Sequence, residues 1–303
     1  MRPYLFKIGG FELRIYSLMY ILAFLFGMFI CLADDVAEKR GVDDRKTIED
    51  FTFSTIVAGL IGARLYYVIF KFPDYAGDPL SIFYIWQGGL AIHGGIIGAF
   101  IGACLFARKN KVNLWVLTDM GVGPLLFGQF LGRFGNLANG EVHGVPTFTP
   151  WNVIFSGKFS EWWAKYQALG VAEQAQFKQL VPWGLTFPLD TPAGSEFPNL
   201  PLHPAMLYEG ALNLIGFLIL WFYFRKKEYN PGVLSMIYLI IYAIIRTFVS
   251  TFRAEDLLIF GIRLPYIISI IMIIIGIVGI KYFSRPERKF VPAENENSKN
   301  DKN

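Results

Sequence analysis

Long apolar stretches separated by short charged ones occupy most of the chain. A helix needs about 20 residues to cross the hydrocarbon core of a bilayer, which is roughly 30 Å thick. Seven stretches reach or approach that length with no more than one Asp, Glu, Lys, Arg or His residue in each. They are residues 15–33, 51–70, 90–107, 112–132, 204–224, 231–245 and 264–280. We expect the sixth stretch to continue past Arg246. The pattern predicts an all-α polytopic membrane protein with seven transmembrane helices.

Lysine and arginine occupy alternate connections between these spans. The basic connections contain Lys39, Arg40, Arg45 and Lys46, then Arg108, Lys109 and Lys111, then Arg225, Lys226 and Lys227, and finally Lys281, Arg285, Arg288 and Lys289. Cytoplasmic connections are enriched in these residues. The alternation therefore places the N-terminus outside and the C-terminus inside. The first apolar run is long enough to span, and acidic residues follow it, so we interpret it as a permanent helix rather than a cleaved signal peptide.

The spans divide the chain into four regions. Residues 1–140 carry spans one to four, 141–203 form an extracytoplasmic cap rich in Trp, Phe, Pro and Gly, and 204–283 carry spans five to seven. Residues 284–303 are a polar cytoplasmic tail, predicted to be disordered from its composition. The apolar segment 78–89 is too short to span, so we expect an interfacial or re-entrant helix there.

Composition and charge narrow the function classes. The 303 residues are 54% hydrophobic and 17% charged with a net charge of +4, which excludes a disordered or nucleic-acid-coating protein and predicts no nucleic acid partner. Cys31 and Cys104 cannot form a disulfide framework and are expected to be packing residues. The three histidines form no close pair, so a metal site is not expected. The sequence also contains neither a phosphate-binding loop of the GxxxxGK[ST] type nor a GxSxG motif.

Most ionisable side chains in or beside the spans gather at the predicted outer ends. They are Tyr16, Arg64, His93, Arg133, Glu141, His203, Glu209, Arg246 and Arg253, whereas Asp119 falls in an inner half. A charged side chain at mid-membrane costs about 3 kcal/mol on insertion scales, so such a group needs a reason. One such reason is structural: the arginines snorkel to lipid headgroups or pair with Glu141, Glu209 and Glu255. An anion site is the interpretation that we favour for the whole set.

The region after span six is unusually basic for an outer connection, since it holds Arg246, Arg253 and Arg263. If the helix continues, one polar stripe contains Tyr242, Arg246, Val249 or Ser250, and Arg253. Guanidinium groups on one side of a bundle suit a phosphate, because arginine stays charged and binds in a bidentate manner.

The densest polar motif is residues 132–144, GRFGNLANGEVHG. Its glycines allow the backbone to turn and to approach a ligand, while Arg133, Asn136, Asn139 and Glu141 offer donors and acceptors. Around His93, Gly94, Gly98 and Gly102 recur every four residues, which indicates close helix packing. An imidazole at the membrane surface can accept a proton near neutral pH, so His93 is a candidate general base, although a lone histidine is more often structural.

These segments resemble the bacterial prolipoprotein diacylglyceryl transferases. GRFGNLANGEVHG is similar to the signature of that family, including its closing Gly144. Further similarity runs through YSLMY from Tyr16, ARLYYVIF from Ala63, AIHGGIIG from Ala91, LHPAMLYE from Leu202 and YAIIRTFVSTFR from Tyr242. Two positions depart from the family pattern: Leu137 where an aromatic residue is common, and Ser250 where an acidic residue is expected.

The resemblance implies an enzyme of the bacterial cytoplasmic (inner) membrane. Such an enzyme transfers the diacylglyceryl group of phosphatidylglycerol to the lipobox cysteine thiol of a prolipoprotein signal peptide, forming a thioether and releasing glycerol phosphate. It implies no cofactor, because the lipid is itself the activated donor.

The resemblance also implies roles for individual residues. The expected catalytic residues are His93, Arg133 and Arg246, and the expected substrate-binding residues are Tyr16, Arg64, Asn136, Asn139, Glu141, Gly144, Tyr242 and Arg253. A secondary transporter for an organic anion is the alternative, because arginines in a bundle also mark permeation paths. A lipid-binding scaffold without activity would explain the basic groups but not the nearby base.

The predicted orientation can be tested by cysteine labelling. In a variant without Cys31 and Cys104, a cysteine at Trp163 in the cap should react with a membrane-impermeant maleimide added outside, because the cap is predicted to be extracytoplasmic. Labelling only after the cytoplasmic side is opened would contradict the orientation.

Overall fold

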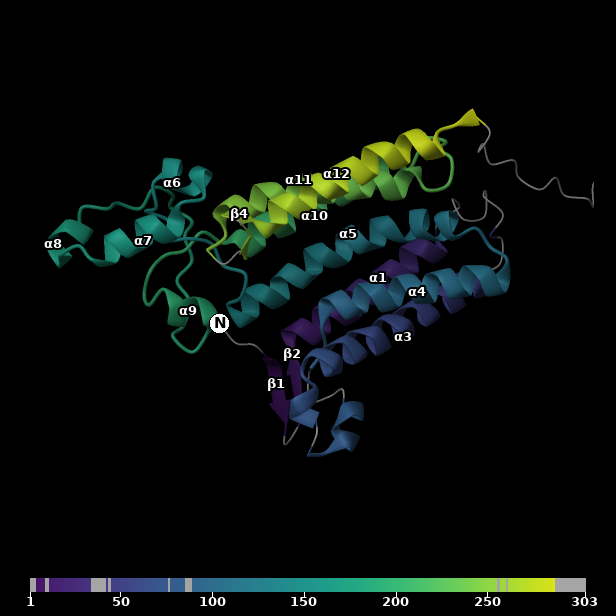
Figure 1. Ribbon diagram of the computed structural model, residues 1–303, viewed down its shortest axis with the longest axis horizontal. Helices are drawn as coiled ribbons and strands as arrows, with labels where there is room; N and C mark the ends of the chain where they lie inside the picture. Colours follow the sequence, from purple (N-terminus) through teal and green to yellow (C-terminus); the bar gives the residue numbers. More distant parts are fainter. Residues whose placement is uncertain are drawn as a thin grey trace, which may run out of the picture. The chain divides into compact units, whose positions relative to one another are not determined.

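The computed structural model describes residues 4–8, 11–33, 42, 45–75, 77–84, 89–254, 257–259 and 261–286 (Figure 1). Seven helices in these residues are long and apolar enough to cross a membrane. They are α1 (Ile15–Leu32), α3 (Arg45–Phe70), α4 (Ile92–Asn110), α5 (Leu114–Asn139), α10 with its π-helical continuation η4 (Ala205–Phe224), α11 (Val233–Phe252) and α12 (Leu264–Phe283). The prediction of seven spans is confirmed. The polar tail from residue 287, residues 85–88 of the predicted interfacial segment and Glu255 lie outside the described residues.

Two helices are longer than the apolar stretches from which they were predicted. Helix α3 begins at Arg45, and α5 continues to Asn139, so most of the glycine-rich motif is helical. A helix is defined by its backbone hydrogen bonds, which polar side chains at a membrane boundary do not interrupt. The motif thus begins on a rigid element and turns only at its last residues.

The shorter elements occupy the connections. Two hairpins join β1 (Tyr4–Ile8) to β2 (Phe11–Arg14) and β3 (Leu258–Ile259) to β4 (Ile262–Arg263). The segment after α3 forms two 3-10 helices, η1 (Phe72–Tyr75) and η2 (Pro79–Phe83), of which the second starts with the side chain of Asp78 accepting from the Leu80 amide. The cap contains α6 (Trp151–Ser156), α7 (Phe159–Gln167), α8 (Val171–Gln174) and α9 (Pro192–Glu196).

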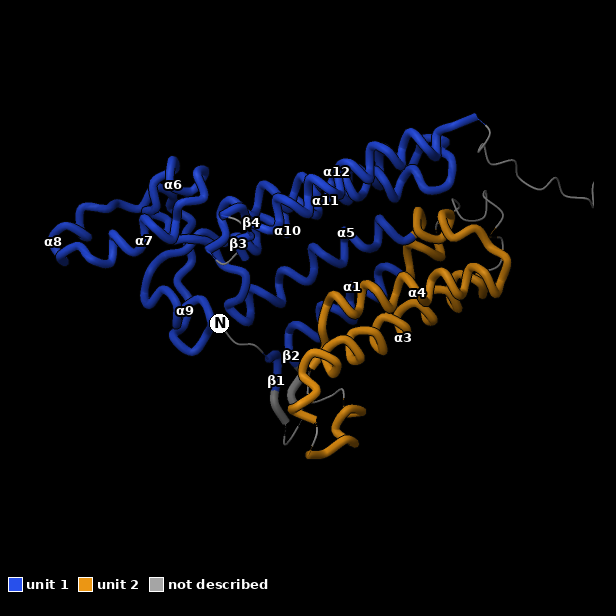
Figure 2. The backbone as a smooth tube through the Cα atoms, viewed as in Figure 1, with its two compact units in different colours: residues 1–27, 121–289 blue, residues 28–120, 290–303 orange. Residues whose placement is uncertain are grey.

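The chain forms two compact units, coloured separately in Figure 2. Unit 1 comprises residues 1–27 and 121–289, and unit 2 comprises residues 28–120 and 290–303.

Unit 2 is built on the close pairing of α3 and α4. A Cβ added to Gly62 would lie 2.7 Å from the Cα of Gly98, and a Cβ added to Gly98 would lie 2.9 Å from the Cα of Gly62. Backbones this close leave no room for a side chain, which is how small residues join transmembrane helices. The packing role predicted for Gly94, Gly98 and Gly102 is confirmed.

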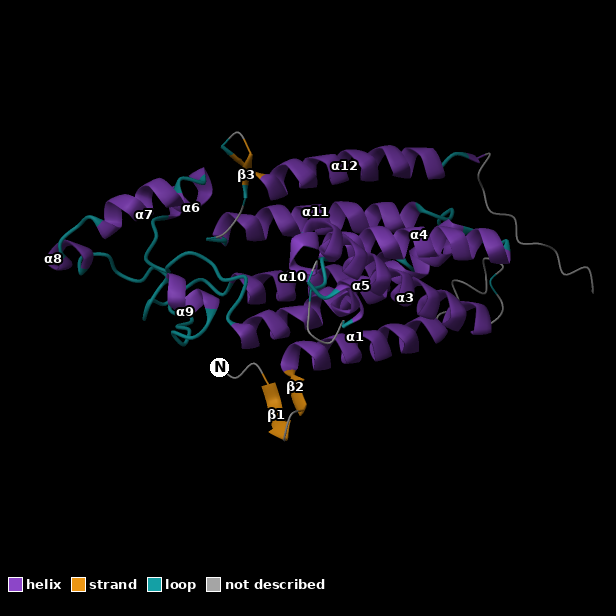
Figure 3. Cartoon of the chain, turned by 60° about the horizontal axis from the view of Figure 1, so that its bottom comes forward, coloured by secondary structure: helices purple, strands orange, loops and turns teal. Residues whose placement is uncertain are grey.

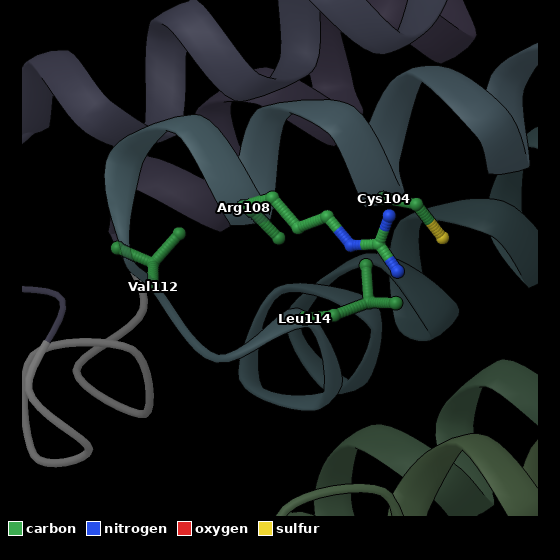
Figure 4. Close-up of a pocket in the computed structure, with 5 residues that line it drawn as sticks. Cys104, Arg108, Val112 and Leu114 are labelled. Carbon is green, nitrogen blue, oxygen red and sulfur yellow. The ribbon is translucent and has the colours of Figure 1, made fainter.

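A small pocket lies at the C-terminal end of α4, opposite the end that carries His93. Cys104, Arg108, Val112 and Leu114 line it, and Figure 4 shows the Arg108 guanidinium lying toward Cys104 and Leu114. Cys31 is buried in the apolar core at this end of the unit, together with Val116 and Leu117. Its expected role in packing is confirmed.

Unit 1 contains β1, β2, the larger part of α1, most of α5, and α10, α11 and α12, with the cap at one end of these helices, as Figure 3 shows from a second side. Helices α11 and α12 approach closely where a Cβ on Gly276 would lie 3.0 Å from the carbonyl oxygen of Met236. An apolar core of Val145, Ile154, Phe197, Leu202 and Met206 joins the cap to the start of α10. This core holds the cap against the ends of the helices that carry the polar groups.

Candidate functional site

A buried carboxylate joins two arginines from different helices of unit 1. Oε1 of Glu209 on α10 lies 2.6 Å from Nη2 of Arg133 on α5, and its Oε2 lies 3.7 Å from Nη1 of Arg246 on α11. The Glu209 side chain is 0% exposed, whereas those of Arg133 and Arg246 are about one-fifth exposed, at 20% and 21%. Glu209 therefore lies beneath the two guanidinium groups, which keep an accessible edge.

The pairing has an electrostatic cause. A carboxylate buried alone loses its hydration without compensation, and two close guanidinium groups repel each other. Placing Glu209 between Arg133 and Arg246 removes both problems. The three residues together carry a net charge of +1, and a guanidinium has five N–H donors, more than one carboxylate can use. The group is therefore suited to bind an anion.

The end of the glycine-rich motif forms a second set of hydrogen bonds. Arg133 Nη1 donates to Asn136 Oδ1 at 3.0 Å, and the side-chain amides of Asn136 and Asn139 donate to the two carboxylate oxygens of Glu141 at 3.4 and 3.3 Å. The backbone N–H of Glu141 also donates to the Asn136 carbonyl at 2.9 Å. The motif thus places Glu141 beside Arg133 through a connected network.

Gly140 makes the turn between Asn139 and Glu141. Its φ of +65° is in the left-handed region, and an added Cβ would lie 2.6 Å from Cβ of Thr191 in the cap. The Gly140 carbonyl accepts from the Ala193 N–H at 3.0 Å. Helix α9 of the cap therefore fixes the turn that positions Glu141.

Gly144 is enclosed by backbone. Its N–H donates to the His203 carbonyl at 2.8 Å, and a Cβ here would lie 2.7 Å from the carbonyl oxygens of both His203 and Phe252. Gly144 also pairs with Arg253 in an antiparallel bridge. The predicted ligand contact at Gly144 stays a prediction, and its evident contribution is to let three chain segments meet.

The predicted stripe on the sixth span is correct except for its last residue, Arg253. Tyr242 and Arg246 lie one turn apart on α11, but the helix ends at Phe252, and Arg253 is extended with a φ of −73° and a ψ of 138°. The predicted helical position of Arg253 is therefore wrong, because the backbone leaves the helix to pair with Gly144. Arg253 is instead held beside Gly144, at the end of the glycine-rich motif.

Arg263 caps the end of α11. Its Nη1 donates to the carbonyl oxygens of Ser250 and, at 3.0 Å, Arg253. The Ser250 carbonyl also accepts from the Arg253 N–H at 3.3 Å, and the Arg253 carbonyl lies past the helix end, where helical hydrogen bonds no longer supply a donor. The third arginine of the basic connection thus has a structural role, and Ser250, where the family pattern favours an acid, contributes its backbone carbonyl.

Tyr16 lies at the start of α1 and packs on the glycine-rich motif. A Cβ on Gly135 would lie 2.9 Å from Cγ of the Tyr16 ring, so only glycine allows this contact. The Tyr16 ring also meets that of Tyr20 edge to face, with centroids 5.0 Å apart. Tyr16 on α1 thus contacts α5, the helix that carries Arg133 and Asn136.

Arg64 and His93 belong to unit 2 and are described within it. Arg64 is 7% exposed and donates to three carbonyl oxygens, of Ile82 and Ser81 at 2.7 Å and of Gly89 at 3.0 Å. Its guanidinium thereby ties the connection after α3 to that helix.

His93 is the second residue of α4 and is exposed. Its ring centroid lies 6.1 Å from that of Tyr66 on α3. The predicted role of His93 as a general base stays a prediction.

Sequence reasoning did not place Glu209 among the site residues, although it named Glu209 as a possible partner of arginines. The signal was a carboxylate within an apolar span, which needs a partner. Only the packing of α5, α10 and α11 identifies that partner as two arginines rather than one.

His203 anchors the start of α10 and is buried, with 1% exposure. Its Nδ1 lies 3.1 Å from the hydroxyl of Tyr208, which accepts from Trp183 Nε1 at 2.7 Å. Burial disfavours the charged imidazolium and lowers the pKa of His203 to about 4. His203 is therefore neutral at pH 7.

The described residues contain no group of three or more His, Cys, Asp or Glu side chains that could hold a metal ion. The arrangement in unit 1 is instead an arginine site supported by carboxylates and amides.

Comparisons with known proteins agree with the resemblance. The family model described as prolipoprotein diacylglyceryl transferase matches residues 3–282. A phosphatidylglycerol–prolipoprotein diacylglyceryl transferase of Fusobacterium nucleatum is 51% identical over 93% of this chain and 98% of its own length. Proteins of the same name from a Synechocystis species and from Thermotoga maritima are 33% and 32% identical, over 92% and 95% of this chain and 88% and 87% of their own lengths.

The buried imidazole predicts acid sensitivity. The folded pKa of His203, about 4, is below the unfolded value near 6.5, so the unfolded chain binds the proton first as pH falls. The stability from neutral His203 is present above pH 6.5 and is lost progressively between about pH 6.5 and 4. The melting temperature of the detergent-solubilised protein should fall less steeply over this range in His203→Gln. An identical pH slope in the two proteins would contradict this.

Proposed function

The chain belongs to the prolipoprotein diacylglyceryl transferase family, and from that premise we propose that the arginine site of unit 1 binds the phosphate of its lipid substrate. The protein is a multi-pass membrane enzyme that transfers a diacylglyceryl group from phosphatidylglycerol to prolipoproteins. The observation that carries the proposal is the Glu209 carboxylate held between Arg133 and Arg246.

The reaction exchanges one bond to carbon for another. The sulfur of the lipobox cysteine, as thiolate, attacks the phosphate-bearing carbon of the diacylated glycerol. A C–S bond forms as the C–O bond breaks, and the electron pair of the broken bond leaves on the oxygen of glycerol phosphate. The thiol proton goes to a base. The enzyme must therefore stabilise negative charge on the leaving phosphate and remove one proton.

Arg133 and Arg246 stabilise the leaving group. Their exposed edges can donate to phosphate oxygens whose charge increases as the C–O bond breaks. Glu209 holds the two forks in place before the lipid arrives, so little reorganisation is needed during the reaction. Tyr242, one turn from Arg246 on α11, and Arg253, paired with Gly144, complete the polar wall.

Asn136, Asn139 and Glu141 orient the headgroup. Glu141 accepts one hydrogen bond at each oxygen from these amides, and each oxygen has a further lone pair. The hydroxyl groups of the headgroup glycerol are suitable donors to it. Gly144 and Tyr16 support this side of the site, through the bridge to Arg253 and the contact with Gly135.

His93 accepts the thiol proton. It is exposed at the start of α4, and an imidazole can act as a base near neutral pH. Arg64 serves the substrate by fixing the connection before α4, where its three hydrogen bonds to carbonyl groups are made.

The enzyme lies in the bacterial cytoplasmic membrane with its cap and arginine site toward the outside. Two considerations support this orientation: the alternation of basic connections in the sequence and the gathering of the polar groups beside the cap.

Replacing Arg133 tests the phosphate role. Arg133→Lys keeps the charge but loses the fork that contacts both Asn136 and Glu209. We expect kcat/KM for transfer from phosphatidylglycerol to a lipobox peptide to fall by about 100-fold or more, a loss of a few kcal/mol. The control is Arg225→Ala, whose guanidinium stacks on Trp221 with its carbon 4.2 Å from the ring centroid. Equal activity in the two variants would contradict the proposed role.

Replacing His93 tests the base. His93→Gln keeps a polar side chain but removes proton acceptance near neutral pH, so transfer should slow by about 100- to 10,000-fold while phosphatidylglycerol binding persists. The deficit should shrink as pH rises toward the thiol pKa near 8.5, because more of the acceptor is already thiolate. A deficit independent of pH would indicate an orienting role, and full activity would exclude His93.

A further inference from the structure

Beneath the arginine site, the packing of α5 and α10 has a regular register. Arg133 meets Glu209, a Cβ on Gly210 would lie 3.7 Å from the Phe130 ring, and a Cβ on Gly216 would lie 3.8 Å from Leu126. From the Arg133–Glu209 pair to the Leu126–Gly216 pair the α5 number falls by seven and the α10 number rises by seven, as antiparallel helices require. The same register places Gln129 level with Asn213, one helical turn from Arg133 and Glu209.

This second level is polar. Gln129 Nε2 donates to the Tyr238 hydroxyl on α11 at 3.0 Å, and Tyr238 stacks with Tyr242, one turn from it, at a centroid distance of 6.1 Å. Asn213 is 0% exposed. Three side-chain atoms at this level have no hydrogen-bond partner among the described residues: Asn213 Nδ2, Asn213 Oδ1 and Gln129 Oε1.

Buried amides without partners are costly. A buried donor or acceptor without a hydrogen bond loses about 1–3 kcal/mol relative to one that has it. Natural structures contain few, and each one requires a physical reason. The mechanism proposed above uses neither Asn213 nor Gln129, so their chemistry is still to be assigned.

The depth of this level identifies the group that it can meet. Four residues of helix rise about 6 Å. The headgroup layer of one leaflet is roughly 5–7 Å thick, from the difference between the total bilayer and its hydrocarbon core. In a lipid whose phosphate lies at Arg133 and Arg246, the ester groups that link the acyl chains to glycerol lie one such layer deeper. Their carbonyl oxygens accept hydrogen bonds.

The number of donors fits the number of esters. Side-chain amides can rotate by 180°, and their oxygen and nitrogen are assigned from their partners. With the Tyr238 hydroxyl donating to Gln129 Oε1, the Gln129 NH₂ group becomes a free donor, as the Asn213 NH₂ group is already. A diacylglyceryl group carries two ester carbonyls, one for each amide.

We propose that Asn213 and Gln129 bind the two acyl ester carbonyls of the donor lipid and thereby select diacyl over dialkyl lipids. The inference rests on the proposed function, because it assumes that the phosphate binds at Arg133 and Arg246. The esters take no part in bond breaking, so the two amides act as specificity-determining residues and not as proton donors.

The test compares phosphatidylglycerol with its diether analogue, which has the same headgroup, chain length and reacting carbon but no ester carbonyls. Both are assayed as donors to one lipobox peptide with the wild-type protein, Asn213→Leu, Gln129→Leu and the control Ser269→Ala. Ser269 is a buried polar residue of α12 whose Oγ also has no hydrogen-bond partner among the described residues.

Wild-type protein should prefer the diester by about 100-fold in kcat/KM, about tenfold for each of the two hydrogen bonds. Each leucine variant should reduce that preference by about tenfold, the upper range of one neutral hydrogen bond, by slowing diester transfer and leaving diether transfer within twofold. Ser269→Ala should keep the wild-type preference. Asn213→Leu should also melt at an equal or higher temperature without lipid, because it replaces an amide without partners by an apolar side chain of similar size.

The outcomes separate the two ideas. Equal use of diester and diether by the wild-type protein, or an equal loss with both donors in Asn213→Leu, would overturn ester recognition while leaving the transferase function intact. A lower melting temperature in Asn213→Leu would also overturn it, since the amide would then be satisfied inside the free protein. No transfer from either lipid by the wild-type protein would count against the proposed function itself.

Discussion

The rest of the site depends on one carboxylate that cannot be buried alone. Glu209 is inaccessible within an apolar helix, and its charge is tolerable only because arginines from α5 and α11 reach it. This requirement fixes the mutual register of three helices more strictly than apolar contacts would, because aliphatic side chains tolerate sliding and ion pairs do not. The accessible edges of Arg133 and Arg246, and the level of the amides beneath them, follow from that register.

The cap makes a comparable contribution through its backbone. Gly140 and Gly144 are the points where the end of α5 meets α9, the start of α10 and the end of α11. At each of them a side chain would collide with another segment, so the motif owes its glycines to packing at least as much as to ligand access. The cap is therefore part of the framework that places Glu141 and Arg253, rather than a separate cover.

The spans could be predicted because an apolar run of about 20 residues with almost no charge is typical of a membrane helix and rare in soluble domains. The contacts among residues of the 132–144 motif could also be predicted, since these residues are adjacent in sequence and become adjacent in space through one turn. Contacts between different helices could not be predicted, because no local sequence pattern relates Glu209 to both Arg133 and Arg246. The same holds for Arg253, where a distant bridge to Gly144 ends the helix that local periodicity extends. It also holds for Arg64, whose carbonyl partners lie up to 25 residues away, in and after η2.

The buried Glu209 also bears on how a turnover ends. Three arginines and the carboxylates of Glu209 and Glu141 leave a net charge of +1, which matches the single negative charge of a phosphodiester. Once the C–O bond has broken, the departing group is a phosphate monoester with a charge of about −1.5 to −2 at neutral pH. Two arginines without a carboxylate between them would retain such a dianion tightly. In the mechanism that we propose, Glu209 cancels part of their charge, which favours release of the water-soluble product before the next lipid binds.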